Sequence, residues 1–398
     1  MMFERLHRLQ TDPILGLMAA FRADTSPRKV DLGVGVYRDD HGETPVLGCV
    51  RRAEEAVLAR QSTKSYVSSV GNVGFNQAME RLVFGESHAA LSSDRVRTIQ
   101  APGGCGALRL GAELIRNAWP DTVIHVSTPT WANHVPLLSG AGLKLERYPY
   151  YDPASGGVRF ESMLAALETL PAHAVVLLHA SCHNPTGADL SEAQWRELLS
   201  VIRRRTLLPF IDMAYQGLGS GTAEDAFAIR LFCEELPEVA VAVSCSKNFG
   251  LYRERTGCLH VLSDSAKSGD AALSHLVRIA RSLYSMPPDH GAAIVHEILG
   301  NPALWQEWTG EVGGMRARLT GLRQELVKHL GRACPQRDFH FIAAQRGMFS
   351  FLGVDTAQVH ALRERHHIYM TDDSRINIGG LRADNLEYFA QAVAQVLG

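Results

Sequence analysis

A lysine set among small polar residues is the first candidate for chemistry in this sequence. Lys247 lies in the segment Ser244–Gly257, directly after a short apolar run. An amine buried at the end of a strand loses its proton readily, which suits Schiff-base formation with a carbonyl compound. The same segment supplies the hydroxyls of Ser244 and Ser246, and the forked guanidinium of Arg255 suits a phosphate group. An isolated Ser-x-Lys is more often a surface lysine, so the hypothesis needs support from elsewhere in the chain.

Three further segments have residue types that could act with this lysine. Asp212 follows an apolar run, and a buried carboxylate there needs a cationic partner, although a turn or helix-capping aspartate fits the pattern equally well. His183–Gly187 reads His-Asn-Pro-Thr-Gly, which by itself is an ordinary turn. Ala101–Arg109 is a glycine-rich turn that opens a helix predicted over Ala107–Trp119, and backbone N–H groups at a helix start can bind an anion. The turn does not match the GxGxxG dinucleotide pattern.

These segments follow short apolar runs that the sequence predicts to be buried strands. Helical patterns such as Ser191–Arg205 separate the runs, which is typical of parallel strands joined by crossover helices. We therefore predict an α/β fold with a wound, mostly parallel sheet and helices on both faces. In such sheets ligands bind at the carboxyl ends of the strands, where the candidate residues stand. The predicted strands are Val123–Val126, Ala174–Leu178, Leu207–Ile211 and Val239–Val243.

The last third of the chain has a different pattern, which predicts a smaller α+β domain. Glu311–Leu330 is helical, whereas Phe339–Ile342 and Met348–Leu352 read as strands. Asp384 can cap a final helix with a regular apolar face. The N-terminal segment has no wound-sheet pattern, so we expect it to pack with the C-terminal part. The predicted boundaries are a large domain over 46–314 and a small domain built from 1–45 and 315–398.

Composition restricts the class of protein. With 46% hydrophobic and 21% charged residues, the 398-residue chain is globular rather than disordered or collagen-like. Forty basic and 42 acidic residues give a net charge of −2, which leaves no basic excess for a nucleic-acid backbone. The seven cysteines contain no CxxC pair, so a disulfide framework is disfavoured and no metal site is predicted. Because no secretory signal or membrane-length apolar run is visible, we expect a cytoplasmic protein.

Taken together and in this order, the segments resemble the class I aminotransferases of the pyridoxal-phosphate fold-type I superfamily. The resemblance is strongest to bacterial aspartate and aromatic (tyrosine) aminotransferases and extends over almost the full chain. It implies a fold-type I pyridoxal-phosphate-dependent transferase that acts as a homodimer with shared active sites. The other segments that carry the resemblance are Asp12–Gly16, Leu32–Tyr37, Tyr151–Asp152, Cys182–Gly187, Gly347–Phe351 and Arg375.

The resemblance implies a cofactor, pyridoxal 5′-phosphate, and a role for each matching residue. Lys247 would carry the cofactor covalently and then shuttle the substrate proton. Asp212, supported by His134, would pair with the pyridine nitrogen so that the ring acts as an electron sink. Tyr215 and Asn184 would hydrogen-bond the phenolic oxygen of the ring. The other cofactor contacts would come from Trp131, stacked on the ring, and from the phosphate-binding residues Gly103, Gly104, Cys105, Ser244, Ser246, Arg255 and, from the neighbouring subunit, Tyr66.

Two arginines would define the substrate class under this resemblance. Arg375 matches the residue that grips the substrate α-carboxylate, with Gly35 beside the same group and Trp131 and Asn184 bordering the substrate. Arg281 matches the arginine that crosses the dimer interface to bind a distal carboxylate. The implied reaction moves an amino group between an L-amino acid (aromatic, aspartate or a related modified one) and a 2-oxo acid such as 2-oxoglutarate, in a ping-pong cycle.

Four positions depart from the family pattern. Cys105 replaces the usual threonine or serine of the phosphate loop, and Thr256 replaces an aliphatic residue. Met286 makes the distal pocket more apolar, because family members usually carry a small polar residue there. Asp373 could merely orient Arg375, or it could recognise a cationic or hydroxylated side chain. From Met286 and Asp373 we hypothesise that the enzyme uses aromatic or modified amino acids and not aspartate alone.

Two alternative functions share this type of cofactor site. A lyase or decarboxylase on the same fold is the first, but the retention of Arg281, Arg375 and Tyr215 favours amino-group transfer between two acids. A non-catalytic, cofactor-sensing regulator is the second. We disfavour it because the catalytic fold takes up the chain and leaves no helix-turn-helix segment or basic patch.

Overall fold

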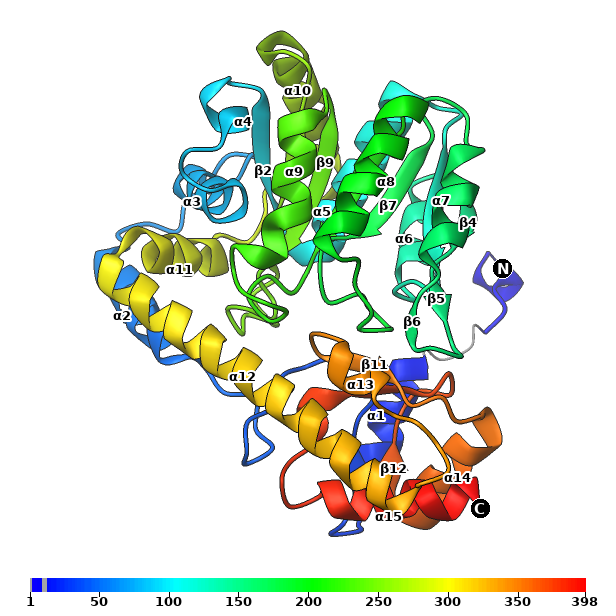
Figure 1. Cartoon of the computed structure of the whole chain (residues 1–398). Coiled ribbons are helices and arrows are strands. Elements are labelled where there is room, and N and C mark those ends of the chain that lie inside the picture. Colours follow the sequence, from blue (N-terminus) through cyan, green and yellow to red (C-terminus); the bar gives the residue numbers. More distant parts are fainter. Residues whose placement is uncertain (1, 9–12) are drawn as a thin grey trace.

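Seven strands of the described chain form one sheet in the larger lobe of the molecule (Figure 1). This computed structural model describes residues 2–8 and 13–398, so Asp12 of the first matching segment lies outside the described residues. The strand order is β2-β10-β9-β8-β7-β3-β4, and only β10 runs antiparallel to its neighbours. The predicted mostly parallel sheet is therefore confirmed. Its strands are β2 (Val96–Pro102), β3 (Val123–Thr128), β4 (Lys144–Pro149), β7 (Val175–His179), β8 (Leu208–Met213), β9 (Val239–Ser244) and β10 (Thr256–Leu262).

The four predicted strands are the central, buried ones, and the sequence pattern missed the rest. All residues of β7 and β9 are buried, which explains their continuous apolar runs. β4 lies at an edge of the sheet, and its exposed Lys144 and Glu146 remove the apolar signal. Charged residues at an edge strand also discourage pairing with another chain. Polar residues likewise interrupt β2 at the other edge, where Arg97 and Gln100 lie.

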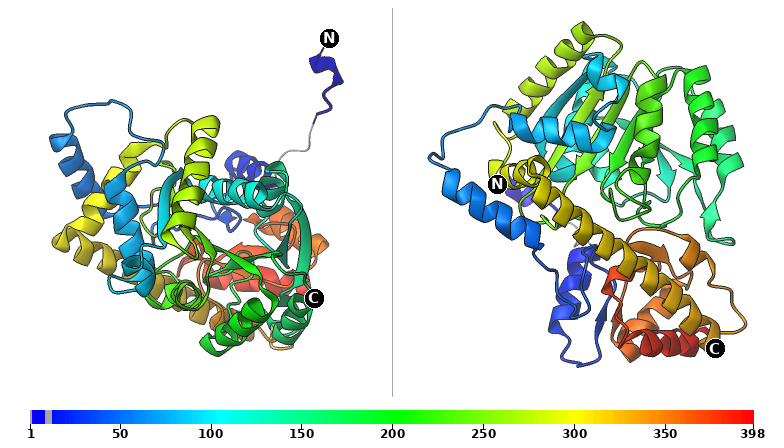
Figure 2. Two further views of the ribbon diagram at one scale, coloured as in Figure 1. Left: turned by 90° about the horizontal axis from the view of Figure 1, so that it is seen from above. Right: turned by 60° about the vertical axis from the view of Figure 1, so that its left-hand side comes forward.

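Helices cover both faces of the sheet, as the alternation of segments predicts (Figure 2). Val175 and Leu177 of β7 enter one hydrophobic core, whereas Val176 and Leu178 enter the other. The first core contains α5 (Gly103–Ala118), α6 (His134–Gly140) and α10 (Ala266–Leu283). The second core contains α3 (Val73–Phe84), α4 (Ala89–Ser92), α7 (Phe160–Glu168), α8 (Glu192–Arg205), α9 (Phe227–Glu235) and α11 (Asp289–Gly300).

Residues 13–31 and the C-terminal part of the chain meet in the second, smaller lobe (Figure 1). β1 (Val30–Asp31) pairs in parallel with β12 (Ile368–Tyr369), and β11 (Phe349–Phe351) pairs with β13 (Arg375–Asn377). The expected packing of the N-terminal segment with the C-terminal part is therefore present. The remaining elements are α1 (Pro13–Ala23), α2 (Gly48–Arg60), β5 (Tyr151–Asp152), β6 (Gly157–Val158), α12 (Pro302–Ala333), α13 (Phe341–Ala344), α14 (Thr356–His366) and α15 (Leu386–Leu397).

Helix α12 connects the two lobes as one continuous element. It has 32 residues, which corresponds to about 48 Å at about 1.5 Å per residue. The helix begins nine residues before the predicted start at Glu311, because Asn301 caps it and Pro302 occupies its first turn. The domain boundary predicted between residues 314 and 315 falls inside this helix, and together with the boundary after residue 45 it stays a prediction.

Two local predictions in the last third are wrong. Phe339–Ile342 does not form a strand, because the chain turns there into the short helix α13. Asp384 does not cap α15: Asn385 occupies the cap position without a side-chain cap bond, and Asp384 instead binds Arg382, with Nε 2.9 Å from Oδ1. The Asp384 carboxylate is therefore paired with Arg382 and does not accept hydrogen bonds from the N–H groups at the start of α15.

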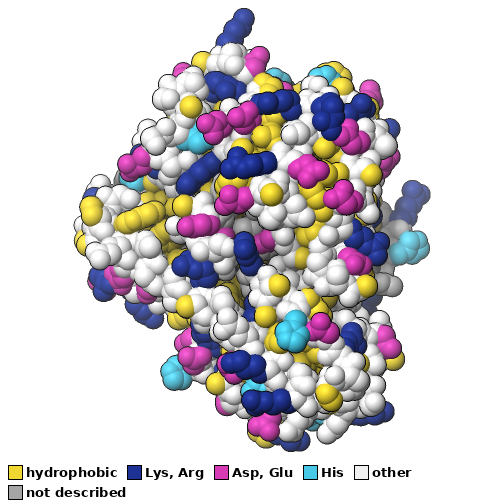
Figure 3. Space-filling model, in the orientation of Figure 1, with side chains coloured by type: hydrophobic (Ala, Val, Ile, Leu, Met, Phe, Trp, Pro, Cys, Tyr) yellow, Lys and Arg dark blue, Asp and Glu magenta, His cyan; other side chains and the backbone are white. Residues whose placement is uncertain are grey.

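Surface charge is mixed on the face drawn in Figure 3, where lysine and arginine alternate with aspartate and glutamate. This distribution fits the net charge of −2. Among the described helices, none has both the length and the apolar character that crossing a membrane requires.

Candidate active site

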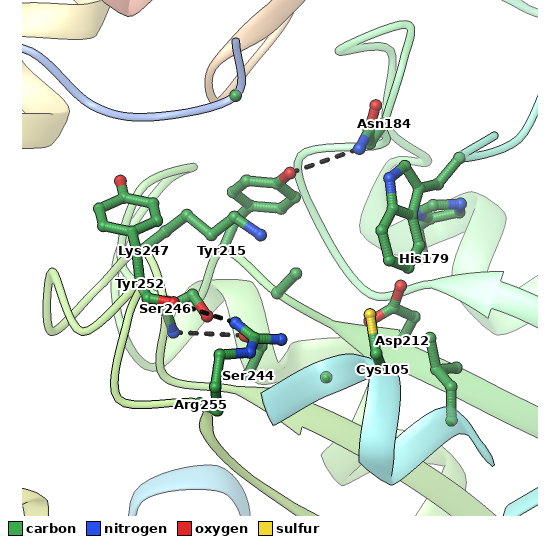
Figure 4. A pocket seen from close by; sticks show the side chains of 15 residues that line it. Cys105, His179, Asn184, Asp212, Tyr215, Ser244, Ser246, Lys247, Tyr252 and Arg255 are labelled. Carbon is green, nitrogen blue, oxygen red and sulfur yellow. Dashed lines mark hydrogen bonds between the residues drawn. The ribbon is translucent and has the colours of Figure 1, made fainter. Parts of the chain in front are cut away.

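A cavity of about 190 Å³ lies at the carboxyl ends of the central strands (Figure 4). β7 ends at His179, β8 at Met213 and β9 at Ser244, so the predicted segments all begin at this edge of the sheet. In Figure 4 Lys247 and Arg255 lie on one side and Asp212 and Cys105 on the other. The predicted site residues that line the cavity are Gly35, Gly104, Cys105, Trp131, Asn184, Asp212, Tyr215, Ser244, Ser246, Lys247 and Arg255.

An anion seat forms where β2 runs directly into α5. In the described part of the chain no side chain caps this helix start, so its backbone N–H groups are available to a ligand. The Arg255 guanidinium lies against Gly103, because a Cβ on that glycine would come within 2.7 Å of Nη2. Gly103 also has a φ of +69°, so both its conformation and its neighbour require glycine. The Ser244 side chain adjoins Gly104, and the set can hold a phosphate-sized anion.

A buried carboxylate and a buried histidine form the opposite wall. Nε2 of His134 lies 3.1 Å from Oδ2 of Asp212, and Nδ1 of the same ring lies 2.8 Å from the Thr130 hydroxyl. Burial acts to raise the pKa of Asp212, but the hydrogen bond from His134 and the nearby Lys247 charge overcome it. The pKa of Asp212 therefore lies below its ordinary value, and this carboxylate is ionised at neutral pH.

The lysine amine lies across the cavity from this carboxylate. Nζ of Lys247 stands 5.0 Å from the centre of the Tyr215 ring. Burial lowers the pKa of Lys247, Asp212 and Cys105 counteract the shift, and Arg255 adds to it. The net shift is downward, so this amine gives up its proton more easily than a surface lysine does. A lysine of this kind can act as a nucleophile toward a carbonyl and as a base.

Two neutral hydrogen-bonding groups border the space between lysine and carboxylate. Nδ2 of Asn184 donates to the Tyr215 hydroxyl at 3.5 Å. Burial raises the pKa of Tyr215 well above its ordinary value, so the phenol keeps its proton and can donate. Trp131 lines the cavity as well, with its ring edge-on to His134 at a centroid distance of 5.2 Å. The arrangement suits a planar ring that carries an oxygen substituent.

Arg375 is a buried cation without a carboxylate partner. Its Nη2 donates to the Gly33 carbonyl at 2.8 Å and its Nη1 to Oδ1 of Asn184 at 3.4 Å. The guanidinium lies 4.4 Å from the centre of the Phe349 ring, and its Nε has no partner in the described structure. Within residues 2–8 and 13–398 no carboxylate lies at ion-pair distance from it. A buried, incompletely satisfied guanidinium is suited to bind a carboxylate ligand.

Asp373 has the simpler of its two predicted roles. Its Oδ1 accepts a hydrogen bond from the Thr371 hydroxyl at 2.5 Å and another from the Arg375 backbone N–H at 3.2 Å. The side chain is exposed and does not line the cavity. It therefore braces the turn before Arg375, and the geometry gives no support to recognition of a cationic substrate side chain.

Two predicted site residues lie at the surface, whereas the three others that do not line the cavity adjoin residues that do. The Tyr66 side chain is 92% exposed. Arg281 is also exposed, and its Nη1 donates to the Ser285 hydroxyl. Met286 is half-buried next to this pair. The structure thus separates Tyr66 and Arg281 from the other predicted site residues.

The remaining departures from the family pattern have different surroundings. The Cys105 side chain lines the cavity, and its Sγ accepts a weak hydrogen bond from Nδ2 of Asn133 at 3.7 Å. The Thr256 hydroxyl is buried without a partner among the described residues, close to the Gly291 backbone. Only Cys105 can therefore contact a ligand in this cavity.

Sequence reasoning missed several residues that complete the site. His179 and Tyr252 line the cavity, and the Tyr252 hydroxyl accepts from the Tyr37 backbone N–H at 2.9 Å. Burial and the nearby His134 lower the pKa of His179 to about 3, so this ring is neutral. The position of His179 at the end of a predicted strand was the available signal. Leu108 and Ala214 also line the cavity.

Comparison with known proteins gives three consistent results. Residues 27–393 match the family model described as aminotransferase class I and II. The chain is 48% identical to the aromatic-amino-acid aminotransferase of Pseudomonas aeruginosa over 99% of this chain and 98% of the relative. It is 41% identical to the aspartate aminotransferase of the same organism over all of both chains. A crystal structure of the aromatic-amino-acid aminotransferase from Burkholderia pseudomallei, covalently bound to pyridoxal phosphate, superimposes with a TM-score of 0.98 at 43% identity and covers all of both chains.

Proposed function

The chain belongs to the class I and II aminotransferases, and from this premise we propose that it transfers the amino group of aromatic L-amino acids and of aspartate to 2-oxoglutarate. It is a transaminase of the pyridoxal-phosphate fold-type I class. One observation carries the proposal for its active site. A lysine with a lowered pKa and an ionised buried aspartate line one cavity, and the buried Arg375, which has no carboxylate partner among the described residues, donates to the cavity-lining Asn184.

The residues of the cavity fit pyridoxal 5′-phosphate, the cofactor of this family. The helix start at Gly103 with Arg255 would hold the phosphate, and Lys247 would bind the aldehyde carbon. Asp212 would face the ring nitrogen, because among the described residues this ionised, buried carboxylate otherwise has only His134 as a side-chain partner. When bound, the cofactor supplies an electron sink for the carbanion at the substrate Cα.

We assign the proton transfers and the binding of substrate to residues of this chain. Arg375 binds the substrate α-carboxylate and orients the Cα–H bond toward Lys247. Nζ of Lys247 accepts the Cα proton, which its lowered pKa favours. Tyr215 and Asn184 would donate hydrogen bonds to the phenolic oxygen of the bound cofactor. Amino acid and 2-oxo acid use the same arginine in turn, so the two half-reactions share one site.

A homodimer would complete the site. Tyr66 and Arg281 are exposed and do not line their own cavity, which supports their serving the cavity of a second copy. The segment 2–8 supports the same assignment: Phe3 is 79% and Leu6 is 72% exposed, and the segment stands away from the body (Figure 2). Arg281 of the partner would bind the distal carboxylate of aspartate and 2-oxoglutarate. Met286 beside it would offer an apolar contact to an aromatic side chain.

A cytoplasmic location completes the proposal. All seven cysteines are free, and those other than Cys105 are buried. Free thiols of this number are typical of a reducing compartment.

A spectroscopic titration tests the proposed function. The purified protein with pyridoxal phosphate should change its visible absorbance when phenylalanine, tyrosine or aspartate is added, and 2-oxoglutarate should reverse the change. The matched control is pyruvate as the acceptor, which lacks the distal carboxylate. Absence of any response to amino acids would remove the transaminase assignment, whereas a response to aspartate alone would remove only the aromatic substrates.

A further inference from the structure

The central part of α12 contains an arginine that is more deeply buried than the substrate-binding one. Arg323 is 2% exposed and has no carboxylate at ion-pair distance within the described residues. Its guanidinium instead donates to backbone carbonyls and one hydroxyl. The acceptors are the carbonyls of Ile342 at 2.9 Å, Arg346 at 3.1 Å, Gly347 at 3.0 Å and Phe349 at 2.6 Å, and Oγ of Ser350 at 2.6 Å. One buried cation thus fixes the backbone from residue 346 to residue 350 from one side.

The same backbone stretch is in direct contact with the loop that carries Asn184. The Arg346 N–H donates to the Gly187 carbonyl at 2.8 Å. A Cβ on Gly187 would lie 2.3 Å from the Phe349 carbonyl oxygen and 3.2 Å from Nη2 of Arg323. On the other side, a Cβ on Gly347 would lie 2.4 Å from Cβ of Cys182. Because the two loops are in direct contact at Gly187 and Gly347, we expect a shift of one loop to move the other.

Both loops meet again at the substrate-binding arginine. The Phe349 ring lies 4.4 Å beneath the Arg375 guanidinium, and β11 and β13 place Phe351 opposite Arg375. From the other loop, Oδ1 of Asn184 accepts from Nη1 of Arg375 at 3.4 Å. Phe349 on one loop, Asn184 on the other and the Gly33 carbonyl together define the position of Arg375. Arg323 contacts the first of these loops and adjoins Gly187 of the second, and it does not line the cavity.

We propose that Arg323 is a positioning residue for substrate carboxylates: by clamping the 346–350 backbone against Gly187, it sets the position of Arg375 relative to Asn184. The proposal rests on the proposed function, because it assumes that Arg375 binds the α-carboxylate. It concerns every amino acid and oxo acid alike, since all share that group. Attachment of the cofactor at Lys247 lies on the other lobe and should be unaffected.

The substitution Arg323→Lys keeps the charge but removes the planar fork, so a single ammonium cannot serve acceptors on several carbonyls. We expect the KM values for tyrosine, aspartate and 2-oxoglutarate each to rise about 10-fold, because small misplacements of a binding group are costly. The kcat should change by less than about threefold, and the absorbance of the bound cofactor should be that of the wild type. Binding of 3-phenylpropionate, a carboxylate without an amino group, should weaken by the same factor as the KM for tyrosine.

A matched control variant can be made at Arg95, which directly precedes the edge strand β2. Arg95 also donates to three carbonyls, those of Ser263, Leu236 and Pro237, at 2.7, 3.1 and 2.8 Å. Arg95→Lys should leave all KM values unchanged. An equal rise in KM in both variants, or a lower melting temperature of Arg323→Lys with unchanged KM, would overturn the positioning role.

A second variant decides the case if Arg323→Lys does not fold. Ser350→Ala removes one acceptor and keeps the guanidinium, and it should raise the same KM values about twofold; unchanged KM values would count against the proposal. Failure of the proposed function is recognised separately, because the wild-type protein would then not respond to amino acids at all.

Discussion

A cavity lies at each end of the strands in the central sheet, and the two differ in size and chemistry. The one at the carboxyl ends measures about 190 Å³ and contains Lys247 and Asp212. The one at the amino ends measures about 830 Å³ and is lined mainly by apolar side chains, among them Trp119, Leu208 and Val261. The larger cavity contains none of the predicted site residues. Volume alone would therefore select the wrong end of the sheet.

The two cavities differ in their electrostatics because the helices beside the sheet run in defined directions. α5 begins at the carboxyl end of β2 and ends at Ala118, with Trp119 as its C-cap, so its N–H groups face the small cavity and its carbonyl end faces the large one. The helix macrodipole favours anions at the first site and disfavours them at the second. α10 follows the antiparallel β10 and runs the other way, which places Arg281 in its last turn. The direction of α5 therefore favours an anionic ligand at the small cavity, while the first turns of α10, with Ser268 and Ala271, line the large one.

The largest effect should come from removing the lysine at the carboxyl end. Lys247→Ala should lower kcat about 10⁴-fold, the upper end of what a positioned acid–base group contributes. Single-turnover kinetics with tyrosine measure the loss. Lys267→Ala, in the first turn of α10, is the matched control and should keep wild-type rates. Substantial turnover in Lys247→Ala would remove the central assignment.

The second-largest loss of kcat should come from neutralising the buried Asp212 carboxylate. Asp212→Asn keeps the size of the side chain but removes the charge that would face the ring nitrogen. We expect kcat to fall about 10²- to 10³-fold, as when other preorganised electrostatic groups are removed. Steady-state kinetics with saturating cofactor measure it, and cofactor affinity distinguishes lost chemistry from lost binding. A variant with unchanged kcat would contradict the role given to Asp212.

Replacement of Arg281 should change kcat/KM differently for aspartate and for aromatic donors. Arg281→Leu should lower kcat/KM for aspartate roughly 10- to 100-fold, because a hydrogen bond to a charged group is lost. The value for phenylalanine should stay the same or rise. The experiment compares both donors with a fixed 2-oxo acid, and Arg278→Leu on the same helix serves as the control. An equal fall for both donors would argue against recognition of the distal carboxylate.

Acid sensitivity should also differ between the two ends of the sheet. The pKa of His179 is lowered to about 3 in the folded protein, mainly by burial, whereas an unfolded histidine takes up a proton near pH 6.5. Folded His179 binds fewer protons, so its contribution to stability is complete above about pH 6.5 and declines as the pH falls toward 3. The slope is about 1.4 kcal/mol per pH unit.

His179→Gln should therefore reduce the fall in melting temperature between pH 6.5 and pH 5. The control is Thr122→Ser at the large cavity, which changes no titratable group and should keep the wild-type profile. Parallel profiles for all three proteins would show that His179 does not contribute to acid sensitivity. Melting curves are best recorded with cofactor bound.

The smallest effect is expected at the amino ends of the strands. Trp119 is 53% exposed, and its ring lies 4.7 Å from that of His173 at the edge of the large cavity. Trp119→Ala should leave kcat/KM for tyrosine and aspartate within about twofold, since exposed positions away from special features tolerate change. A loss of activity without a loss of stability would assign the large cavity a function and weaken the contrast between the two ends.

The central strands and the site segments that follow them were predictable because their signals are local. An apolar run ending in Asp212 or Ser244 places the next residues at the carboxyl edge whatever the rest of the chain does. The edge strands β2 and β4 were not found, because their exposed or polar residues break the apolar pattern. The expected cap at Asp384 failed because Arg382 was not considered as a competing partner.

The sequence by itself determined the family, the cofactor class and the identity of most cavity residues, since each of these depends on residue types in short segments. Tertiary structure decided the rest. It placed the Asp373 carboxylate against the Arg375 N–H, the Phe349 ring beneath Arg375, and Arg323 among carbonyls up to 26 positions away. Every residue carries a backbone carbonyl, so residue types do not reveal which ones will meet at a buried guanidinium. Only the path of the folded chain brings those acceptors together.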